Sequence, residues 1–298
     1  MGFGRGKVIL LGEHAVVHGC PAIAVGIERG VTADAVVAER DLLRLAPWDL
    51  TLGPDAESDE PLERAFAAAL ALYPGRPALD VSALVDLPAG AGLGCSAAIG
   101  VAVLDAIDEA LGIERTRLEL AAAALSWERV FHGNPSGIDN TMSAVGGVAL
   151  YRRDEVLRPL HSNKPLHLVI GYSGESSSTK DMVASVGRQL ENDPKRVTQA
   201  FEGIEVLVRN AKLAIEAGDH IALGQLLDLN HTILSSLMLC TTQLDDMCRA
   251  ARGAGALGAK MTGAGGGGCM FALATKRDEA LRLQGVLGEG AFGVEVSA

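Results

Sequence analysis

A glycine-rich segment between an apolar strand and an apolar helix constrains the fold of this chain most. Residues 79–87 alternate in polarity as a strand does, residues 97–111 are almost entirely apolar, and Gly90, Gly92 and Gly94 lie between them. Glycine permits positive φ and lets a ligand come close to the backbone. Because a helix N-terminus presents free N–H groups and the positive end of the helix dipole, the loop predicts a phosphate site. No lysine follows Gly94, so the loop is not a P-loop.

The composition excludes several classes of protein. The chain has 298 residues, 48% of them hydrophobic, so it can form a sizeable core and is not intrinsically disordered. Its net charge of −11 and its 4% aromatic content argue against binding to nucleic acid or to an anionic membrane surface. An anionic ligand would therefore need a local site made of backbone amides, a metal ion or a few cationic side chains.

A second glycine-rich segment, Gly263–Gly268, formally matches the GxGxxG pattern of dinucleotide-binding proteins. That motif requires a helix after the loop, whereas Cys269–Ala274 has the pattern of a strand. We therefore reject the nicotinamide-cofactor interpretation. The segment predicts a loop between two strands, which either covers a substrate or phosphate group or forms only a tight hairpin.

Two charged regions accompany these loops. Lys7 precedes the first apolar strand, and Glu13 and His14 follow it. Lys7 could meet an anion, and Glu13 and His14 could hydrogen-bond a polar ligand. Each residue taken alone is equally consistent with a solvated surface group.

The second charged region contains two acids. Glu128 lies near a predicted helix C-terminus, where the dipole disfavours a carboxylate unless a cation is bound. Asp139 follows a turn over Asn134–Gly137, after a helix that we expect Gly133 to end. Ser96 either caps the helix after the central loop or holds a metal ion. Together with Lys7, these residues form a set suited to phosphoryl transfer.

The order of the predicted elements indicates an α+β fold, since strands, then helices, then strands follow one another without a regular βαβ alternation. Thr116 and Glu119 have the spacing of a capping box. Strands are predicted at 8–11, 22–27, 31–38, 79–87, 148–151, 166–171, 269–274 and 292–296, and helices at 62–73, 97–111, 116–132, 179–190, 196–217, 221–237 and 244–254.

The chain is expected to form two domains, residues 1–155 and 156–298, because its composition changes near residues 152–165. Its five cysteines contain no CxxC pair and predict reduced thiols. No apolar run approaches the roughly 20 residues that span a bilayer. A predicted strand close to the N-terminus leaves no room for a signal peptide, so we expect a cytoplasmic location.

Three motifs in this order resemble those of the GHMP kinase family. They are Gly6–Gly19, Pro88–Ala98 and Lys260–Cys269, and they span nearly the whole chain. Within the family, the stretch Glu128–Asn140 and the segment Ser178-Thr179-Lys180 are most similar to those of mevalonate kinases. The resemblance implies a two-domain fold: an N-terminal domain like the second domain of ribosomal protein S5, and a C-terminal ferredoxin-like and helical α+β domain, with the active site in the cleft between them.

The resemblance also implies roles for individual residues, with ATP and Mg²⁺ as cofactors. Asp139 would accept the proton of the substrate hydroxyl, and Lys7 would lie against that hydroxyl and the γ-phosphate. Ser96 and Glu128 would hold Mg²⁺. The remaining implied residues contact the nucleotide (Pro88, Gly90, Ala91, Gly92, Leu93, Gly94, Cys95 and Ser96) or the substrate, mevalonate (Glu13, His14, Thr179, Gly263, Ala264 and Gly265).

The expected reaction is ATP-dependent phosphorylation of the 5-hydroxyl of mevalonate, a step in the synthesis of isoprenoid precursors, and the chain is compatible with a homodimer. One alternative is another kinase of the family, such as a phosphomevalonate kinase, and a second is a non-catalytic metabolite sensor. Two residues depart from the usual family pattern. Arg5 stands where a proline is usual, and Cys95 stands where a serine is usual, which suggests the hypothesis of a thiol-reactive enzyme.

Overall fold

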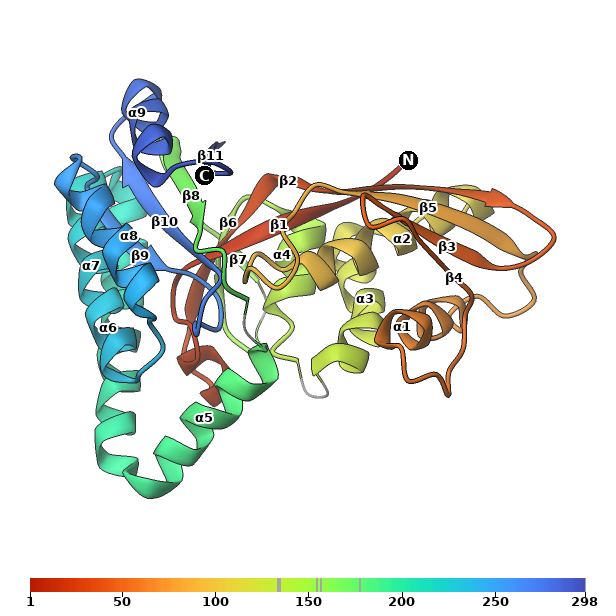
Figure 1. Ribbon diagram of the computed structural model, residues 1–298, viewed down its shortest axis with the longest axis horizontal. Coiled ribbons are helices and arrows are strands. Elements are labelled where there is room, and N and C mark those ends of the chain that lie inside the picture. The colour runs from red at the N-terminus through yellow and green to blue at the C-terminus, as the bar shows by residue number, and fades with distance from the viewer. Residues whose placement is uncertain (133–134, 154, 156, 177, 298) are drawn as a thin grey trace. The chain divides into compact units, whose positions relative to one another are not determined.

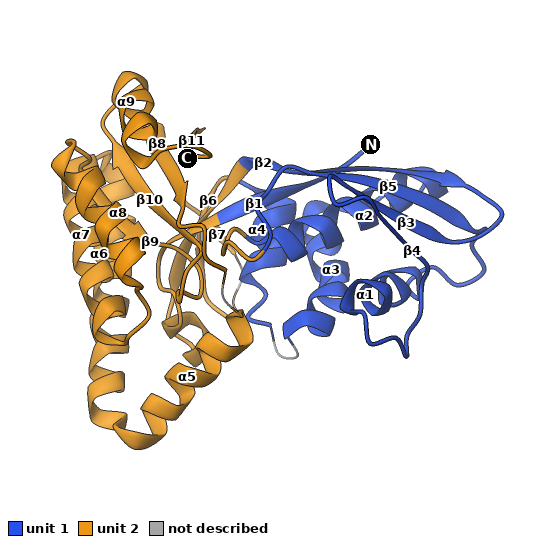
Figure 2. Cartoon of the chain, viewed as in Figure 1, with its two compact units in different colours: residues 1–7, 28–89, 94–146 blue, residues 8–27, 90–93, 147–298 orange. Residues whose placement is uncertain are grey.

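The computed structural model describes residues 1–132, 135–153, 155, 157–176 and 178–297, which form two compact units (Figures 1 and 2). Unit 1 comprises residues 1–7, 28–89 and 94–146, and unit 2 comprises residues 8–27, 90–93 and 147–298. The predicted helix-ending Gly133 and the first turn residue, Asn134, lie outside the described residues. The predicted domain boundary between residues 155 and 156 stays a prediction, because each compact unit consists of several separate segments of the chain.

Two long strands take part in both units. Strand β1 covers Gly2–Leu11 and strand β2 covers Ala22–Val37. The sequence analysis predicted two strands within residues 22–38, and this was wrong, because β2 continues through the polar residues Glu28 and Arg29. Gly30 permits this course, since a Cβ there would lie 2.1 Å from the Gly4 carbonyl oxygen.

In unit 1, a sheet carries helices that bury apolar faces. Strand β5 (Leu79–Val85) pairs antiparallel with Val31–Val37 of β2 and parallel with β3 (Leu42–Ala46), which pairs with β4 (Leu50–Leu52). The sequence analysis did not predict β3 and β4. The helices are α1 (Pro61–Leu70), α2 (Cys95–Leu111), α3 (Arg117–His132) and α4 (Ile138–Val145).

Helix α2 is the centre of unit 1, and it packs against β5, α3 and α4. Most of its residues are buried, as its apolar sequence predicts. It also lies against the backbone of β1, because a Cβ on Gly4 would come within 2.0 Å of the Ala98 carbonyl oxygen. The capping box before α3 is confirmed: Thr116 N–H donates to Glu119 Oε2 at 2.8 Å, and Glu119 N–H donates to Thr116 Oγ1 at 3.2 Å.

Unit 2 contains a four-stranded antiparallel sheet in the order β11-β8-β10-β9. Helices α7 and α8 pack against β9, and α9 packs against β8. The strands are β8 (Leu166–Tyr172), β9 (Gly258–Met261), β10 (Cys269–Ala274) and β11 (Phe292–Val296), and the helices are α5 (Thr179–Asn192), α6 (Pro194–Ala217), α7 (His220–Ser236), α8 (Thr242–Gly253) and α9 (Arg277–Leu287).

Two further strands of unit 2 extend from β2. Strand β6 (Val148–Tyr151) pairs antiparallel with Ala22–Val25, and the two-residue β7 (Arg158–Pro159) pairs with β6. A 3₁₀ turn, Ala15–His18, follows β1. Among the described helices, none is both long and apolar enough to cross a membrane.

Candidate active site

The predicted base and the predicted cation meet within unit 1. Lys7 lies on β1, and Asp139 lies in the first turn of α4. Lys7 Nζ is 2.8 Å from Asp139 Oδ1. The Lys7 side chain is only 5% exposed, whereas that of Asp139 is 30% exposed, so the aspartate remains within reach of a ligand. The sequence analysis placed Asp139 after a turn and did not predict α4, which has only eight residues.

Gly94 makes room for this ion pair. It is the N-cap of α2 and has a φ of +72°. A Cβ at this position would lie 2.9 Å from Lys7 Cγ, closer than side chains pack. The last glycine of the central loop therefore permits both the left-handed turn into the helix and the course of the Lys7 side chain.

Ser96 and Glu128 form a second polar contact between predicted site residues of unit 1. Ser96 Oγ donates to Glu128 Oε1 at 2.7 Å, and among the described residues no side chain caps α2. Glu128 is 1% exposed, and burial, together with the negative charge of Asp139, raises its pKa to about 7. A buried carboxyl group beside a hydroxyl and near a second carboxylate is a site that a divalent cation would stabilise. The donor set therefore fits Mg²⁺.

His132 is a neighbour of Glu128 that the sequence analysis missed. Its Nε2 lies 3.7 Å from Glu128 Oε2. Burial lowers the pKa of His132, which favours the neutral ring. The sequence could have indicated this contact, because Glu128 and His132 are four residues apart on one helix, a spacing that places their side chains on the same face.

In unit 2, the two glycine-rich loops pack backbone against backbone. Cys269 N–H donates to the Ala91 carbonyl oxygen at 2.9 Å. A Cβ on Gly92 would lie 3.0 Å from the Thr262 carbonyl oxygen, and a Cβ on Gly263 would lie 2.9 Å from Gly92 Cα. The prediction of a loop between two strands is confirmed, because residues 262–268 connect β9 with β10.

Glu13 and His14 are both buried at the end of β1. Lys260 Nζ donates to Glu13 Oε1, and the two side chains are 0% and 1% exposed. His14 Nε2 is 2.8 Å from the Ala264 carbonyl oxygen, and burial lowers the pKa of this histidine. Glu13 is thus part of a buried ion pair, and His14 is bonded to the second glycine-rich loop.

No separate role for Lys260 is predicted from the sequence. The sequence feature that could have indicated a buried lysine is a single charged residue in a run of small and apolar residues, Gly258–Met261. Such a lysine is buried only when it has a partner. Burial lowers the pKa of Lys260, while Glu13 opposes that shift.

Thr179 is exposed at the first position of α5. The segment before this helix contacts both glycine-rich loops: Gly268 N–H donates to the Glu175 carbonyl oxygen at 2.8 Å, and a Cβ on Gly90 would lie 3.1 Å from Ser176 Cβ. Glu175 and Ser176, shortly before Thr179, thus lie against these loops, and the contact of Thr179 with a substrate remains a prediction.

Cys95 and Pro88 belong to unit 1. Pro88 is half-buried before the central loop. Cys95 is buried, and burial raises the pKa of its thiol to about 12. Since the thiolate is the reactive form, this environment disfavours a reactive Cys95, and the hypothesis of a thiol-reactive enzyme stays a prediction.

The predicted site residues thus form one set in each unit. Unit 1 holds Lys7, Gly94, Ser96, Glu128 and Asp139. Pro88 and Cys95 also belong to unit 1, and unit 2 holds the remaining members, namely Glu13, His14, Gly90–Leu93, Thr179 and Gly263–Gly265. Leu93 of one set and Gly94 of the other are consecutive in the chain.

Two family models match this chain. Residues 62–147 match the GHMP kinase N-terminal domain, and residues 211–290 match the GHMP kinase C-terminal model. The chain belongs to the GHMP kinase family. It is 38% identical to a protein named mevalonate kinase from Pyrococcus horikoshii, over 91% of this chain and 87% of that protein.

Solved structures show the same fold. The crystal structure of L. major mevalonate kinase in complex with R-mevalonate matches with a TM-score of 0.87 and 28% identity, over 99% of this chain and 95% of that chain. The Methanococcus jannaschii mevalonate kinase matches with a TM-score of 0.85 and 23% identity, over 99% and 98% of the two chains. The two-domain GHMP kinase fold predicted from the sequence is therefore confirmed.

Proposed function

We propose that this chain is an ATP-dependent mevalonate kinase, which transfers the γ-phosphoryl group of ATP to the 5-hydroxyl of mevalonate. The Lys7–Asp139 contact carries the proposal, because it pairs a proton acceptor with a cation beside Gly94, the N-cap of α2. Family membership supports the reaction type. The substrate is supported by relatives named mevalonate kinase and by the structural neighbour that contains R-mevalonate.

The reaction requires positioning and charge stabilisation more than covalent chemistry by the protein. Asp139 accepts a hydrogen bond, and then the proton, from the substrate hydroxyl. Lys7 stabilises the negative charge that develops on the same oxygen during transfer. The N-terminus of α2 contributes backbone N–H groups and the positive end of its dipole for the phosphates.

Ser96 and Glu128 would hold Mg²⁺, which would neutralise phosphate charge when bound. The Ser96 and Glu128 side chains are already arranged for binding without the metal ion. Ser96 fixes one carboxylate oxygen of Glu128, and the burial of Glu128 reduces competition from water. A cation would relieve the cost of ionising this carboxyl group.

Lys7→Met is expected to lower kcat by about 10² or more, because it removes the charge that stabilises the reacting oxygen. Steady-state ADP release with saturating ATP and mevalonate measures the effect. The exposed lysine variant Lys195→Met serves as the control and should match the wild type. A Lys7→Met enzyme within about threefold of the wild-type kcat would argue against the assigned role.

Glu128 predicts a pH dependence of Mg·ATP use. Its raised pKa, about 7, means that the carboxyl group keeps its proton in the folded protein up to near neutral pH. A bound cation must displace that proton. As the pH rises from 6 to 7, KM for Mg·ATP should therefore fall by up to about tenfold per pH unit, and it should level off above pH 7.

Glu128→Gln should raise KM for Mg·ATP at pH 8 and remove this part of the pH profile. Glu39→Gln, at an exposed position of unit 1, is the control. An unchanged pH profile in Glu128→Gln would show that another group titrates.

A coupled ADP-release assay over mevalonate, phosphomevalonate, homoserine and galactose tests the proposed substrate. We expect turnover with mevalonate alone. Turnover with phosphomevalonate would favour the phosphomevalonate kinase alternative, and ATP binding without turnover on any acceptor would favour a sensor. Light scattering of the purified protein tests the proposed homodimer.

A further inference from the structure

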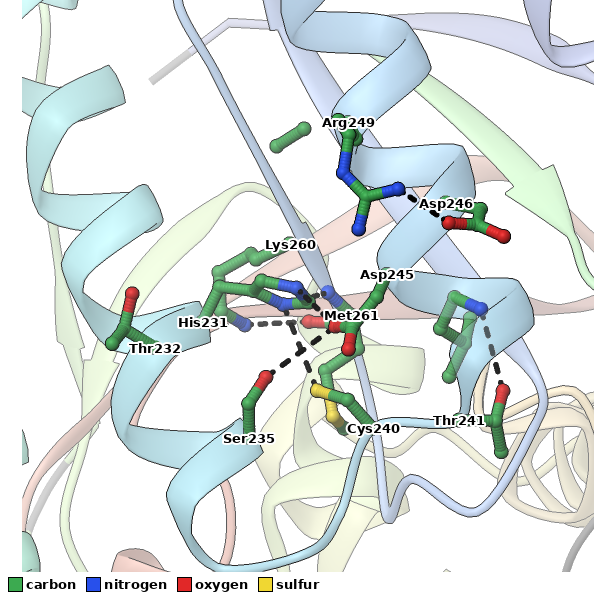
Figure 3. Close-up of polar contacts among 12 residues, drawn as sticks. His231, Thr232, Ser235, Cys240, Thr241, Asp245, Asp246, Arg249, Lys260 and Met261 are labelled. Carbon is green, nitrogen blue, oxygen red and sulfur yellow. Dashed lines mark hydrogen bonds and ion pairs between the residues drawn. The ribbon is translucent and has the colours of Figure 1, made fainter.

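Three side chains with different metal-binding atoms converge in unit 2, apart from the residues assigned to phosphoryl transfer. His231 lies on α7, Cys240 lies in the connection after it, and Asp245 lies in the first turn of α8 (Figure 3). One nitrogen, the sulfur and one carboxylate oxygen all lie within 4.8 Å of one another. This group is called the His-Cys-Asp cluster below.

The imidazole ring of His231 is fixed from both of its nitrogens. Nε2 lies 2.9 Å from Asp245 Oδ1, and Nδ1 accepts a hydrogen bond from Met261 N–H at 3.3 Å (Figure 3). Cys240 Sγ is 3.7 Å from Nδ1, and Ser235 Oγ is 3.4 Å from Asp245 Oδ1. A histidine oriented by neighbouring groups and close to a thiol is typical of metal sites as well as of structural polar networks.

We propose that the His-Cys-Asp cluster binds a thiophilic divalent cation of the zinc class. Imidazole nitrogen, thiolate sulfur and carboxylate oxygen are the three ligand types that Zn²⁺ takes in proteins. Mg²⁺ prefers oxygen ligands and does not select a thiol. The cluster therefore differs in metal preference from the Ser96 and Glu128 pair of unit 1.

The charge balance of the cluster suits a dication. In the metal-bound form, the Cys240 thiolate and the Asp245 carboxylate would together carry two negative charges, and His231 would bind through its neutral ring. Within the described parts of the chain, Asp245 has no lysine or arginine at ion-pair distance, and the nearby Arg249 is paired with Asp246 at 2.6 Å. Binding forms a metal–sulfur bond and breaks the Cys240 S–H bond, so one proton leaves to solvent.

The geometry requires only a small closure around an ion. Nitrogen and sulfur ligands on one tetrahedral Zn²⁺ are about 3.5 Å apart, given bond lengths of about 2.0 and 2.3 Å. The ligand atoms within 4.8 Å of one another would thus move by about 1 Å. His231 would exchange one of its present hydrogen bonds for the metal bond. Since the Asp245 side chain is 39% exposed, solvent provides an entry path and a fourth ligand.

The cluster is directly connected to the second glycine-rich loop. Met261, which bonds the His231 ring, immediately precedes Thr262 and the loop. The carbonyl oxygen of Leu239, the residue before Cys240, accepts a hydrogen bond from Gly266 N–H at 2.7 Å. A Cβ on Gly265 would lie 2.3 Å from that same oxygen. Closure of the cluster around a metal would shift both anchors of the loop, so we expect the cation to inhibit the kinase reaction.

Cobalt binding to the reduced full-length protein, without substrates, tests the site. Co²⁺ substitutes for Zn²⁺, and a thiolate ligand gives a ligand-to-metal charge-transfer band in the near ultraviolet. We expect this band to saturate at one ion per chain and to be displaced by Zn²⁺. Cys240→Ser should lose the band, and Asp245→Asn should bind Co²⁺ at least about tenfold more weakly.

Matched controls separate this site from other thiols and acids. Cys20→Ser removes another half-buried cysteine of unit 2, and Asp246→Asn removes the neighbouring acid; both should bind Co²⁺ like the wild type. Circular dichroism spectra check that the variants are folded. Absence of the band in the wild type, or a wild-type band in Cys240→Ser, would overturn the proposal, irrespective of the substrate of the enzyme.

Discussion

Asp139→Asn is expected to lower kcat by about 10² or more, while the affinity for ATP changes little. The amide cannot accept the proton of the substrate hydroxyl, and it removes the negative partner of Lys7 at 2.8 Å. The substitution keeps the size of the side chain at the start of α4, where the residue is part of a helical turn. The loss should therefore appear in the chemical step.

Single-turnover phosphorylation of mevalonate, followed by rapid quenching, measures that step directly. Asp86→Asn is a matched control, because Asp86 is also in unit 1 and is also paired with a cationic side chain, Arg29, at 2.8 Å. The control should retain the wild-type rate. If Asp139→Asn reacted at a similar rate to the control, Asp139 would not be the proton acceptor.

Lys260→Met is expected to destabilise unit 2 by about 3–5 kcal/mol, since it leaves the buried Glu13 carboxylate without its cation. Both side chains are almost completely inaccessible to solvent, at 0% and 1% exposure. For a unit of this size, the loss corresponds to a decrease of roughly 6–20 °C in the midpoint of thermal unfolding. Differential scanning calorimetry of the substrate-free protein measures the change.

The double variant Glu13→Gln with Lys260→Met should recover much of this stability, because no uncompensated charge remains. Lys212→Met is the control for loss of a lysine ion pair in the same unit. Its partner, Glu216, lies four residues further along α6, and both side chains are more than a third exposed, so the melting temperature should hardly change. Equal effects of Lys260→Met and Lys212→Met would contradict a stabilising role for the buried pair.

Local sequence patterns predicted the central loop and most of the longer helices, because their signals lie within a few residues. The central loop was predicted from its neighbours, an alternating strand and an apolar helix, and α2 begins at Cys95, two residues before the predicted start at residue 97. The capping box before α3 was visible from Thr116 and Glu119 alone. Short elements such as α4 and β4 were missed, since three to eight residues contain too little periodicity.

The partners of the charged residues were beyond the reach of local patterns. Glu13 and Lys260 are 247 positions apart, and nothing in either neighbourhood indicates the other. The sequence suggested that Glu13 could face a ligand, whereas its carboxyl group is buried against Lys260. For Lys7 and Asp139, the expected proximity came from the family resemblance and was then found in the geometry of unit 1.

The interleaving of the two units has a consequence for synthesis on the ribosome. Every segment of unit 1 has been translated once residue 146 is added, so this unit can complete its fold early. Residues 8–27 emerge near the beginning, yet Ile9 bonds Thr262, which follows 253 positions later. The apolar N-terminal strand must therefore stay unaggregated until the last third of the chain has been synthesised. We expect folding in the cell to depend on the pace of translation or on a chaperone.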